Sequence, residues 1–342
     1  MKNKSNIRDV AAAAGVSVAT VDRVLNKRPG VRAQTVAKVE AVLKQLSYRP
    51  DVYAARLSKN HSLRLVFVVP RGHNSFMDLL VEALHKTAEN LAYERCFIDI
   101  RFVDAFDGQA VAATLNSLTA EDGDGVAVVA PDAPLVAEAI NGCIARGLRL
   151  VTLVSDLPSS GRQHFVGIDN VAAGRVAGRL LGRFCAGQRG SVALIAGSMT
   201  LRDHVERHLG CKQVLQASFP NLKVLPGEEG QDLAEPTASA ARELLNRHPN
   251  LIGIYNIGAG NRGLVKALHE HPGRQIVTIA HELTAISRQA LVDGTFDAII
   301  CQDPAHEVRS AVRLLRSLCE GGEIVRSQER IRIEIFLHDN LP

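Results

Sequence analysis

The sequence predicts a small all-α head followed by an α/β body. From residue 63 onward, short apolar runs such as LRLVFVVP, GVAVVAP and SVALIAG alternate with amphipathic stretches of about ten to twenty residues, an alternation typical of parallel sheets with crossover helices. Residues 1–50 show helical periodicity alone. Charge changes at the same boundary, because residues 1–62 contain 12 Lys+Arg against 4 Asp+Glu, whereas the remainder contains 28 against 32. A basic head on a mildly acidic body indicates a nucleic-acid module joined to another function.

Two short helices are expected first. Apolar residues share one helical face at Ile7, Val10, Ala11 and Ala14. Asn6 is placed to cap this helix, Asp9 lies in its first turn, and Gly15 supplies the positive φ of a sharp turn. Ser17 can cap a second helix, whose inward side chains are Thr20, Val21, Val24 and Leu25. This arrangement predicts a helix-turn-helix, whose second helix enters the DNA major groove; the alternative is an ordinary helical hairpin.

A third helix follows and favours the first interpretation. VRAQTVAKVEAVLKQLSYRP is amphipathic, and Pro50 ends it because proline disfavours α geometry at the residue before it. Residues 51–59, DVYAARLSK, could form a further short helix, but they contain too few apolar side chains to be stable alone.

The head resembles one known family throughout its length. The runs DVAAAAGVSVATVDRVLN, VRAQTVAKVEAVLKQLSYRPD and AARL are similar to the lactose-repressor (LacI/GalR) family of bacterial transcription regulators. The resemblance implies that Val18 and Ala19 begin the base-reading surface, with Arg23 one turn on. It also implies a hinge helix at residues 51–59 that pairs with its dimer mate in the minor groove, where Leu57 would be a wedge with Ala54 beside it. The expected DNA-binding set is Ser17, Val18, Ala19, Thr20, Arg23, Asn26, Ala54 and Leu57.

One residue departs from the family pattern. Asp22 stands where the family usually has Ser, and a carboxylate close to phosphates would be repelled. Asp22 could instead accept a hydrogen bond from a cytosine amino group, or it could point away from the DNA.

The resemblance also implies the layout of the whole chain. We expect a DNA-binding domain at residues 1–50, a hinge helix and linker at 51–62, and a ligand-binding domain at 63–342. About eight βα units would fit a (β/α)₈ barrel, but the resemblance favours two doubly wound lobes like those of periplasmic sugar-binding proteins, facing each other across a cleft. The chain should cross between lobes near 169, 298 and 327, so that lobe one comprises about 63–168 and 299–327, and lobe two about 169–298 and 328–342.

Ligand contacts are expected in the loops after the strands, because open α/β sheets bind ligands beyond the carboxyl ends of their strands. Carboxylates, amides and Arg suit hydroxyl groups, and a flat ring suits an apolar sugar face. Resemblance to ribose-type binding proteins implies roles for Asn74 and Phe76 in HNSF, for Asp156, for Arg202 in GSMTLR and for Gln302 in IICQDP. The complete set is Asn74, Phe76, Asp156, Asn170, Arg202, Asn256, His281, Glu282 and Gln302.

Two of these positions carry qualifications. His281 replaces an Asp of the ribose-type proteins, and Leu157 replaces an Arg, so we expect a different sugar, a polyol or a derivative rather than ribose. Asp169-Asn170 is equally consistent with a helix cap and with a ligand contact.

A nicotinamide-dependent oxidoreductase is the rival from another class. GAGNRG at 258–263 fits G-x-G-x-x-G after a strand, with Glu282 nineteen residues further on. That fingerprint usually opens its domain, however, and no catalytic Tyr/Lys or Cys/His arrangement accompanies it. His204 and His208 are four residues apart on a predicted helix, but the other residues of a metal-binding motif are missing from the sequence around them. We therefore expect neither an enzyme nor a metal or other cofactor.

Composition indicates the compartment. The six cysteines are dispersed without C-x-x-C, which is typical of buried thiols in a reduced cytosol. No signal-peptide core and no apolar run of ~18 residues is present, so export and membrane insertion are not expected. We predict a cytoplasmic homodimer that acts as a repressor, binds double-stranded operator DNA and responds to a small effector.

Overall fold

The computed structural model describes residues 6–25, 28–46, 48, 62–71 and 74–342. It divides into two units, Met1–Ser62 and Leu63–Pro342. The predicted DNA contacts Asn26, Ala54 and Leu57, and the hinge segment 51–59, lie outside the described residues. In the part of the chain that is described, no helix has the length and apolar character that crossing a bilayer requires.

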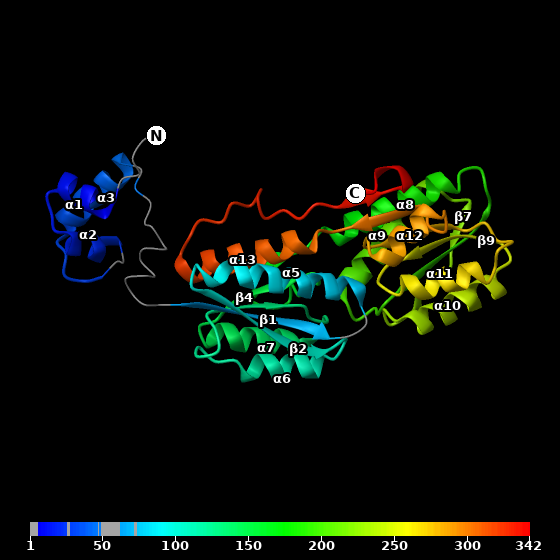
Figure 1. The fold of residues 1–342 in the computed structure, drawn as a ribbon, viewed down its shortest axis with the longest axis horizontal. Coiled ribbons are helices and arrows are strands. Elements are labelled where there is room, and N and C mark those ends of the chain that lie inside the picture. The colour runs from blue at the N-terminus through cyan, green and yellow to red at the C-terminus, as the bar shows by residue number, and fades with distance from the viewer. Residues whose placement is uncertain (1–5, 26–27, 47, 49–61, 72–73) are drawn as a thin grey trace. The chain divides into compact units, whose positions relative to one another are not determined.

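The head contains helices α1 (Ile7–Ala14), α2 (Val18–Leu25) and α3 (Ala33–Gln45) (Figure 1). Asn6 and Asp9 form a capping box at the start of α1, and Gly15 ends that helix at φ 62°. The backbone N–H of Thr20 donates to Ser17 Oγ at 3.2 Å, which caps α2. These caps are the predicted ones, and they place the turn between α1 and α2 where a helix-turn-helix requires it.

The three helices of the head share one small core. Its fully buried side chains come from each helix and are Val10, Ala14, Val21 and Val39. At roughly 2 kcal/mol for each buried aliphatic side chain, this core is enough to hold short helices that would be marginal in isolation.

Lobe one of the body is an open parallel sheet of order β2-β1-β3-β4-β5. Its elements are β1 (Leu63–Arg71), α5 (Ser75–Ala92), β2 (Cys96–Asp104), α6 (Gly108–Ser117), β3 (Gly125–Val128), α7 (Pro134–Ala145), β4 (Arg149–Leu153), β5 (His164–Val166) and α13 (Pro304–Glu320).

Lobe two contains the second sheet, of order β12-β11-β10-β9-β6-β7, with β8 paired to β6. Its elements are α8 (Asn170–Phe184), β6 (Gly190–Ala196), α9 (Arg202–Ser218), β7 (Leu222–Val224), β8 (Glu228–Glu229), α10 (Ala234–Arg247), β9 (Leu251–Asn256), α11 (Asn261–His269), β10 (Val277–His281), α12 (Ala285–Val292), β11 (Ala298–Cys301), β12 (Glu334–Phe336) and the 3₁₀ turn η1 (His338–Asn340). Only the short edge strand β12 is antiparallel to its neighbour.

The two lobes repeat one topology. From β7 to β11 the second sheet follows the same doubly wound order as the first, with the change of direction at β1/β3 and at β6/β9. The body is therefore not a barrel. The chain crosses from β11 to α13 through residues 302–303, beyond the predicted boundary at 298/299, because Ala298–Cys301 is a strand of the second sheet, paired with β10.

Helices cover both faces of each sheet. In lobe one, α5 and α13 lie on one face, and α6 and α7 on the other (Figure 1). In lobe two, α8 and α9 cover one face, and α10, α11 and α12 the other. Near-continuous burial of the strands follows, as in β6, where every residue is buried.

Helices α8 and α9 approach unusually closely because glycines face each other's backbone. A Cβ at Gly174 would lie 2.0 Å from the carbonyl oxygen of Arg207, and one at Gly210 would lie 2.1 Å from that of Val171. This close packing sets the position of α9, whose first turns enter the space between the lobes.

The cysteines behave as small core residues. Five of the six are buried, Cys319 is partly exposed, and all six are free thiols. Burial raises the pKa of the Cys185 thiol to about 11, as expected for structural rather than reactive cysteines.

Candidate functional site

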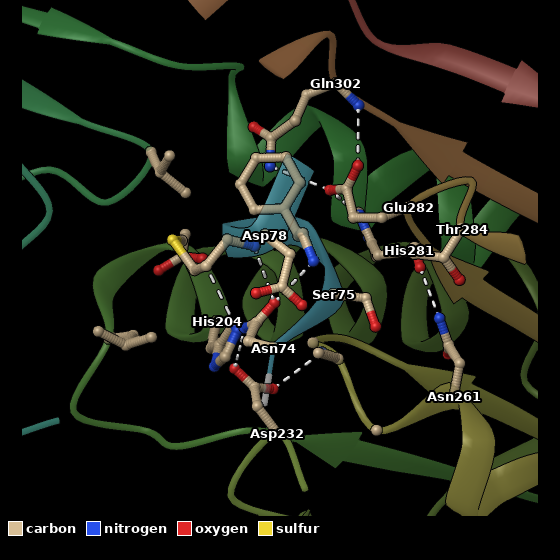
Figure 2. A pocket seen from close by; sticks show the side chains of 18 of the residues that line it. Asn74, Ser75, Asp78, His204, Asp232, Asn261, His281, Glu282, Thr284 and Gln302 are labelled. Atoms are coloured by element: carbon tan, nitrogen blue, oxygen red, sulfur yellow. Dashed lines mark hydrogen bonds and ion pairs between the residues drawn. The ribbon is translucent and has the colours of Figure 1, made fainter. Parts of the chain in front are cut away.

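A cavity of about 340 Å³ lies between the two lobes, at the carboxyl ends of their strands (Figure 2). Lobe one contributes residues 74–78 at the start of α5 and the ends of β3 and β4. Lobe two contributes the first turns of α9, Asp232, the loop 258–262 and the residues after β10. This is where doubly wound sheets bind ligands, and the volume is within the usual range for small-molecule sites.

Asn74 links the lobes across this cavity. Its side-chain oxygen caps α5 by accepting from the backbone N–H groups of Phe76 and Met77 at 3.0 and 3.3 Å. Its Nδ2 donates to Asp232 Oδ2 of lobe two at 3.1 Å, as Figure 2 shows. One amide therefore both begins a helix and joins the two walls of the cleft.

Asp232 is held rigidly on the lobe-two side. Its Oδ1 accepts from the backbone N–H of Ala259 at 2.8 Å, and its own backbone has φ 55°, in the left-handed region. A Cβ at Gly197 or Gly258 would lie 2.1 or 2.3 Å from Oδ1. Both glycines are thus required for the carboxylate to reach the cleft.

His281, Glu282 and Gln302 form the wall nearest the crossover into α13. Glu282 accepts from the Gln302 side chain at 3.0 Å and from the Gln302 backbone at 3.3 Å. Burial raises the pKa of Glu282 to about 7, although Arg207 and the hydrogen bonds from Gln302 oppose this. Burial, together with the positive charge of Arg207, lowers the pKa of His281 well below its usual range, so the imidazole is neutral. It shares a 2.7 Å hydrogen bond with the Tyr255 hydroxyl through Nε2.

Arg207 is the buried cation of the site. Its Nε donates to Asn170 Oδ1 at 2.8 Å and its Nη1 to the carbonyl of Ile257 at 3.0 Å. Its Nη2 has no hydrogen-bond partner among the described residues, and the residue lines the cavity. The guanidinium is therefore fixed by two bonds and presents the third nitrogen for a ligand.

Several other buried polar atoms of the cavity wall also lack a hydrogen-bond partner in the part of the chain that the structure describes. Besides Arg207 Nη2 they are Ser155 Oγ, Asp203 Oδ1, His281 Nδ1 and Gln302 Oε1. Buried polar groups are nearly always hydrogen-bonded in folded proteins. Both donors and acceptors converging on one cavity are the arrangement expected of a site for a hydroxyl-rich ligand.

Apolar side chains also line the cavity. Phe76, which is 5% exposed, is joined in the lining by Val154, Leu201 and Ile286. An aromatic ring in a cavity that also contains polar groups suits a ligand with one apolar and one polar face.

Five of the nine predicted ligand contacts line the cavity: Asn74, Phe76, His281, Glu282 and Gln302. The other four do not. Asp156 receives hydrogen bonds from Thr152 and from the Arg162 guanidinium instead. Arg202 pairs with Glu206 at 2.7 Å and, across the cleft, with Asp132 at 3.5 Å, and its side chain is 38% exposed.

The two asparagines among these four residues do not line the cavity but form hydrogen bonds with residues that do. Asn170 lies in the first turn of α8, with Asp169 as the N-cap, and it orients Arg207. Asn256 donates to Asn261 Oδ1 at 2.8 Å, and Asn261 in turn donates to the carbonyl of His281 at 2.8 Å.

Four further polar residues line the cavity and were not predicted from the sequence: Asp203, Arg207, Asp232 and Asn261. A signal was available for one pair, since Asp203 and Arg207 are four residues apart and so share a face of the helix after β6. No comparable signal marks Asp232, which lies in a loop between a two-residue strand and α10.

The GAGNRG glycines have packing roles. Gly258 makes room for Asp232, Gly260 has φ 90° and lies against Thr237, and a Cβ at Gly263 would lie 1.8 Å from the carbonyl oxygen of Ala234. The motif therefore accounts for the contact between α10 and α11 without a dinucleotide. Among the described residues, no group of three His, Cys, Asp or Glu side chains is placed to hold a metal ion.

In the head, the start of α2 presents an exposed surface. Ser17, Val18, Ala19 and Arg23 are exposed, and Thr20 is half-buried. Val18 is 41% exposed, which is notable for a β-branched apolar side chain in so small a domain. Asp22 pairs with Arg28 at 3.4 Å, so its carboxylate carries a counter-charge of its own.

Comparisons with known proteins agree with this architecture. Residues 6–51 match the family model described as bacterial regulatory proteins, lacI family. Residues 65–323 match the model described as periplasmic binding protein domain.

The curated relatives include proteins named as transcriptional regulators. The HTH-type transcriptional regulator DegA of Bacillus subtilis (strain 168) is 35% identical over 91 residues, which are 27% of each chain. TreR of Escherichia coli (strain K12) is 33% identical over 134 residues, 37% of this chain and 39% of that one. Catabolite control protein A of Staphylococcus aureus (strain MRSA252) is 25% identical over 214 residues, 61% of this chain and 60% of that one. The chain thus matches less than two thirds of the length of each.

Solved structures of sugar-binding proteins share the fold of the body. GanP, a glucose-galactose binding protein from Geobacillus stearothermophilus, superposes with a TM-score of 0.72 at 21% identity, over 82% of this chain and 99% of its own. A solute-binding protein from Burkholderia graminis, solved with D-arabinose, gives 0.73 at 24% identity, over 82% and 96%.

Proposed function

We propose that the chain is a transcriptional regulator of the lacI family whose DNA binding responds to a small ligand in the inter-lobe cavity. Two findings support this: residues 65–323 belong to the periplasmic binding protein domain family, and residues 6–51 match the family model of lacI regulatory proteins. The observation that carries this proposal is the convergence of unpartnered buried donors and acceptors on that cavity. A purely architectural DNA-binding protein would have no use for such a wall.

The effector is a sugar, a polyol or a derivative without a phosphate group. Four carboxylate side chains line the cavity, from Asp78, Asp203, Asp232 and Glu282, against the two guanidinium groups of Arg207 and Arg262. Surplus acceptors favour hydroxyl donors and disfavour an anionic ligand.

DNA binding is assigned to the head. The exposed start of α2, with Ser17, Val18, Ala19 and Arg23, reads base edges in the major groove, as expected for a helix-turn-helix. The protein acts as a homodimer on a pseudo-palindromic double-stranded operator, since two-fold protein symmetry is mirrored in two-fold DNA. Residues 51–59, including Ala54 and Leu57, are the proposed minor-groove hinge.

The switch is a change in the arrangement of the two lobes. Among the described residues, three hydrogen bonds join them across the cleft: Asn74 to Asp232, the Asp132 backbone N–H to the Thr200 carbonyl at 3.0 Å, and Arg202 to Asp132. A ligand that binds one lobe arrangement better shifts the equilibrium by that difference in affinity and by no more. The protein is proposed to be a cytoplasmic repressor without catalytic activity.

The test is thermal unfolding of the full chain against a panel of free sugars, polyols, sugar phosphates and NAD(P), because a ligand that binds only the folded state raises the melting temperature. Stabilisation by a neutral sugar or polyol is expected. The stabilising compound should then change the affinity of the protein for a DNA duplex selected from a random library. Stabilisation by NAD(P) alone would refute the proposal and revive the oxidoreductase.

A further inference from the structure

A second cavity adjoins the first. It measures about 330 Å³ and lies over the ends of β1, β2 and β3, with residues 231–233 and Leu201 of lobe two as its opposite wall. We call this cavity the second chamber and the cavity of the candidate site the first chamber. The volume of the second chamber also falls within the range of small-molecule sites.

The two chambers share a wall. Asn74, Met77, Val129, Leu201 and Asp232 line both of them. The hydrogen bond between Asn74 and Asp232, drawn as a dashed line in Figure 2, occupies the polar part of this wall. The remaining part consists of the apolar side chains Met77, Val129 and Leu201. A ligand bound in the first chamber therefore has an apolar boundary beside it, beyond which lies further space.

The floor of the second chamber is apolar and its rim is polar. Val103, Val111, Val129, Ala130 and Pro131 are all buried there. The charged and amide side chains Arg71, Asp104 and Gln231 are exposed. Arg71 lies over the Phe102 ring, 5.2 Å from its centroid, and this contact holds its charge outside the floor. A second sugar ring would have few partners on such a floor, whereas a hydrocarbon or aryl group would have many.

Backbone strain concentrates around the two chambers. Among the described residues, six non-glycine residues have φ in the left-handed region, and five of them line one chamber or the other. Val154 and Glu282 line the first chamber, and Phe106 and Gln231 the second, while Asp232 lines both. Such conformations are energetically costly and cluster at functional sites. The strain on both walls of the second chamber marks it as a built part of the site rather than a packing defect.

We propose that the natural effector carries an apolar substituent, as an alkyl or aryl glycoside does, and that this substituent occupies the second chamber while the polar ring stays in the first. The inference rests on the proposed function, because it specifies the ligand of the same site. The substituent enters the second chamber by displacing the apolar side chains of the shared wall, Met77, Val129 and Leu201, so the hydrogen bond between Asn74 and Asp232 need not break.

The experiment compares matched pairs of ligands on the full chain by calorimetry. The probes are the methyl and phenyl β-D-glycopyranosides of glucose, galactose, xylose and arabinose, together with the free sugars. The wild type is compared with Ala105→Phe, which fills the second chamber from an exposed position. The control is Ala186→Phe, the same change at an exposed position outside both linings.

For one sugar of the series, the phenyl glycoside should bind the wild type and the control roughly tenfold more tightly than the methyl glycoside does. A gain in affinity of about this size is usual when a ligand makes additional apolar contacts in a pocket. Ala105→Phe should abolish that advantage and leave binding of the methyl glycoside unchanged. Equal affinities for the two glycosides, or an advantage that survives Ala105→Phe, would overturn the inference.

The outcomes also separate this inference from the proposed function. Binding of free sugars with rejection of every glycoside would leave the sugar-responsive regulator standing and remove the second chamber from the site. Failure of all free sugars and glycosides to bind in this experiment, together with failure of the polyols to stabilise the chain in the thermal-unfolding panel, would remove both.

Discussion

At the residue scale, the site depends on one arginine held by its own neighbours. Arg207 is 3% exposed, and two of its nitrogens donate hydrogen bonds to Asn170 and Ile257. That arrangement fixes the plane of the guanidinium, so the direction of the third nitrogen is set before any ligand arrives. Such preorganisation lowers the entropic cost of binding.

Arg207→Lys should therefore weaken ligand binding about tenfold to a hundredfold, since a hydrogen bond to a charged group contributes ~1.5–3 kcal/mol and Lys cannot reproduce the planar fork. Calorimetry with the stabilising compound measures this. Arg202→Lys, the same change on the same helix at a half-exposed ion pair, should alter the affinity less than threefold. Equal losses in both variants would contradict the assignment of Arg207.

Glu282 makes stability depend on pH. Its pKa is about 7 in the folded protein, against the ordinary value of 4.5, because burial disfavours the charged form. The folded state therefore binds more protons than the unfolded state between these values, and stability falls as pH rises from 4.5 through 7.

Compared with Glu282→Gln, which stays neutral, the wild type should lose up to roughly 3 kcal/mol of unfolding free energy across this range. Urea unfolding of both proteins at several pH values gives the difference. A difference that is independent of pH, or that grows in favour of the wild type at high pH, would show that Glu282 is not protonated in the folded protein.

At the scale of elements, the contact between α8 and α9 decides which side chains enter the cavity. Gly174 and Gly210 let the two backbones touch. A methyl group at either position would push α9 away from α8, and Arg207 would move with it.

Gly174→Ala should reduce the unfolding free energy by about 1–3 kcal/mol, the usual cost of overpacking, and should weaken ligand binding in the protein that remains folded. Gly273→Ala is the control, because a Cβ there meets nothing within 4 Å. Denaturant unfolding and calorimetry check the two effects. A Gly174→Ala protein with unchanged stability and affinity would show that α8 can shift without cost.

Helix α2 carries the corresponding prediction for DNA. Arg23→Ala should weaken binding to the selected duplex by ~1–3 kcal/mol, because an arginine that contacts a base edge supplies energy of that size. Ligand binding should not change. Arg183→Ala, at an exposed arginine of the body, is the control in an anisotropy titration, and an equal response of the two variants would remove Arg23 from the reading surface.

At the scale of the whole body, the lobe arrangement depends on a few polar contacts across the cleft. Asn74 provides the sharpest probe, because its two side-chain atoms have separate roles: the oxygen caps α5 and the nitrogen reaches Asp232. A change that keeps the cap and removes the donor acts on the lobes alone.

Asn74→Asp should do this, since Asp caps helices as well as Asn but places a carboxylate against Asp232. We expect the lobes to separate, which small-angle scattering would detect as a larger radius of gyration, and ligand affinity to fall. The control is Asp107→Asn at the cap of α6, which accepts from Gln109 and Ala110. An unchanged radius of gyration would show that the hydrogen bond between Asn74 and Asp232 does not hold the lobes.

The sequence by itself determined the local features of this protein. The caps at Asn6 and Ser17, the turn at Gly15 and the alternation of strands with helices follow from the residues in question and their immediate neighbours. The strand-end rule likewise placed His281, Glu282 and Gln302 near the cavity, because His281 ends an apolar strand and Glu282 and Gln302 each directly follow one. These are statements about position along the chain, and spacing is sufficient to make them.

Only the tertiary structure decided which side chains meet. The sequence favoured Arg202, at the strand end, whereas Arg207 reaches the cavity, because the face of α9 that points inward is set by its packing on α8 through Gly174 and Gly210. Asp232 enters the site for a similar reason, through glycines at 197 and 258 that are distant in sequence. Long-range packing fixes these orientations, and no local pattern encodes them.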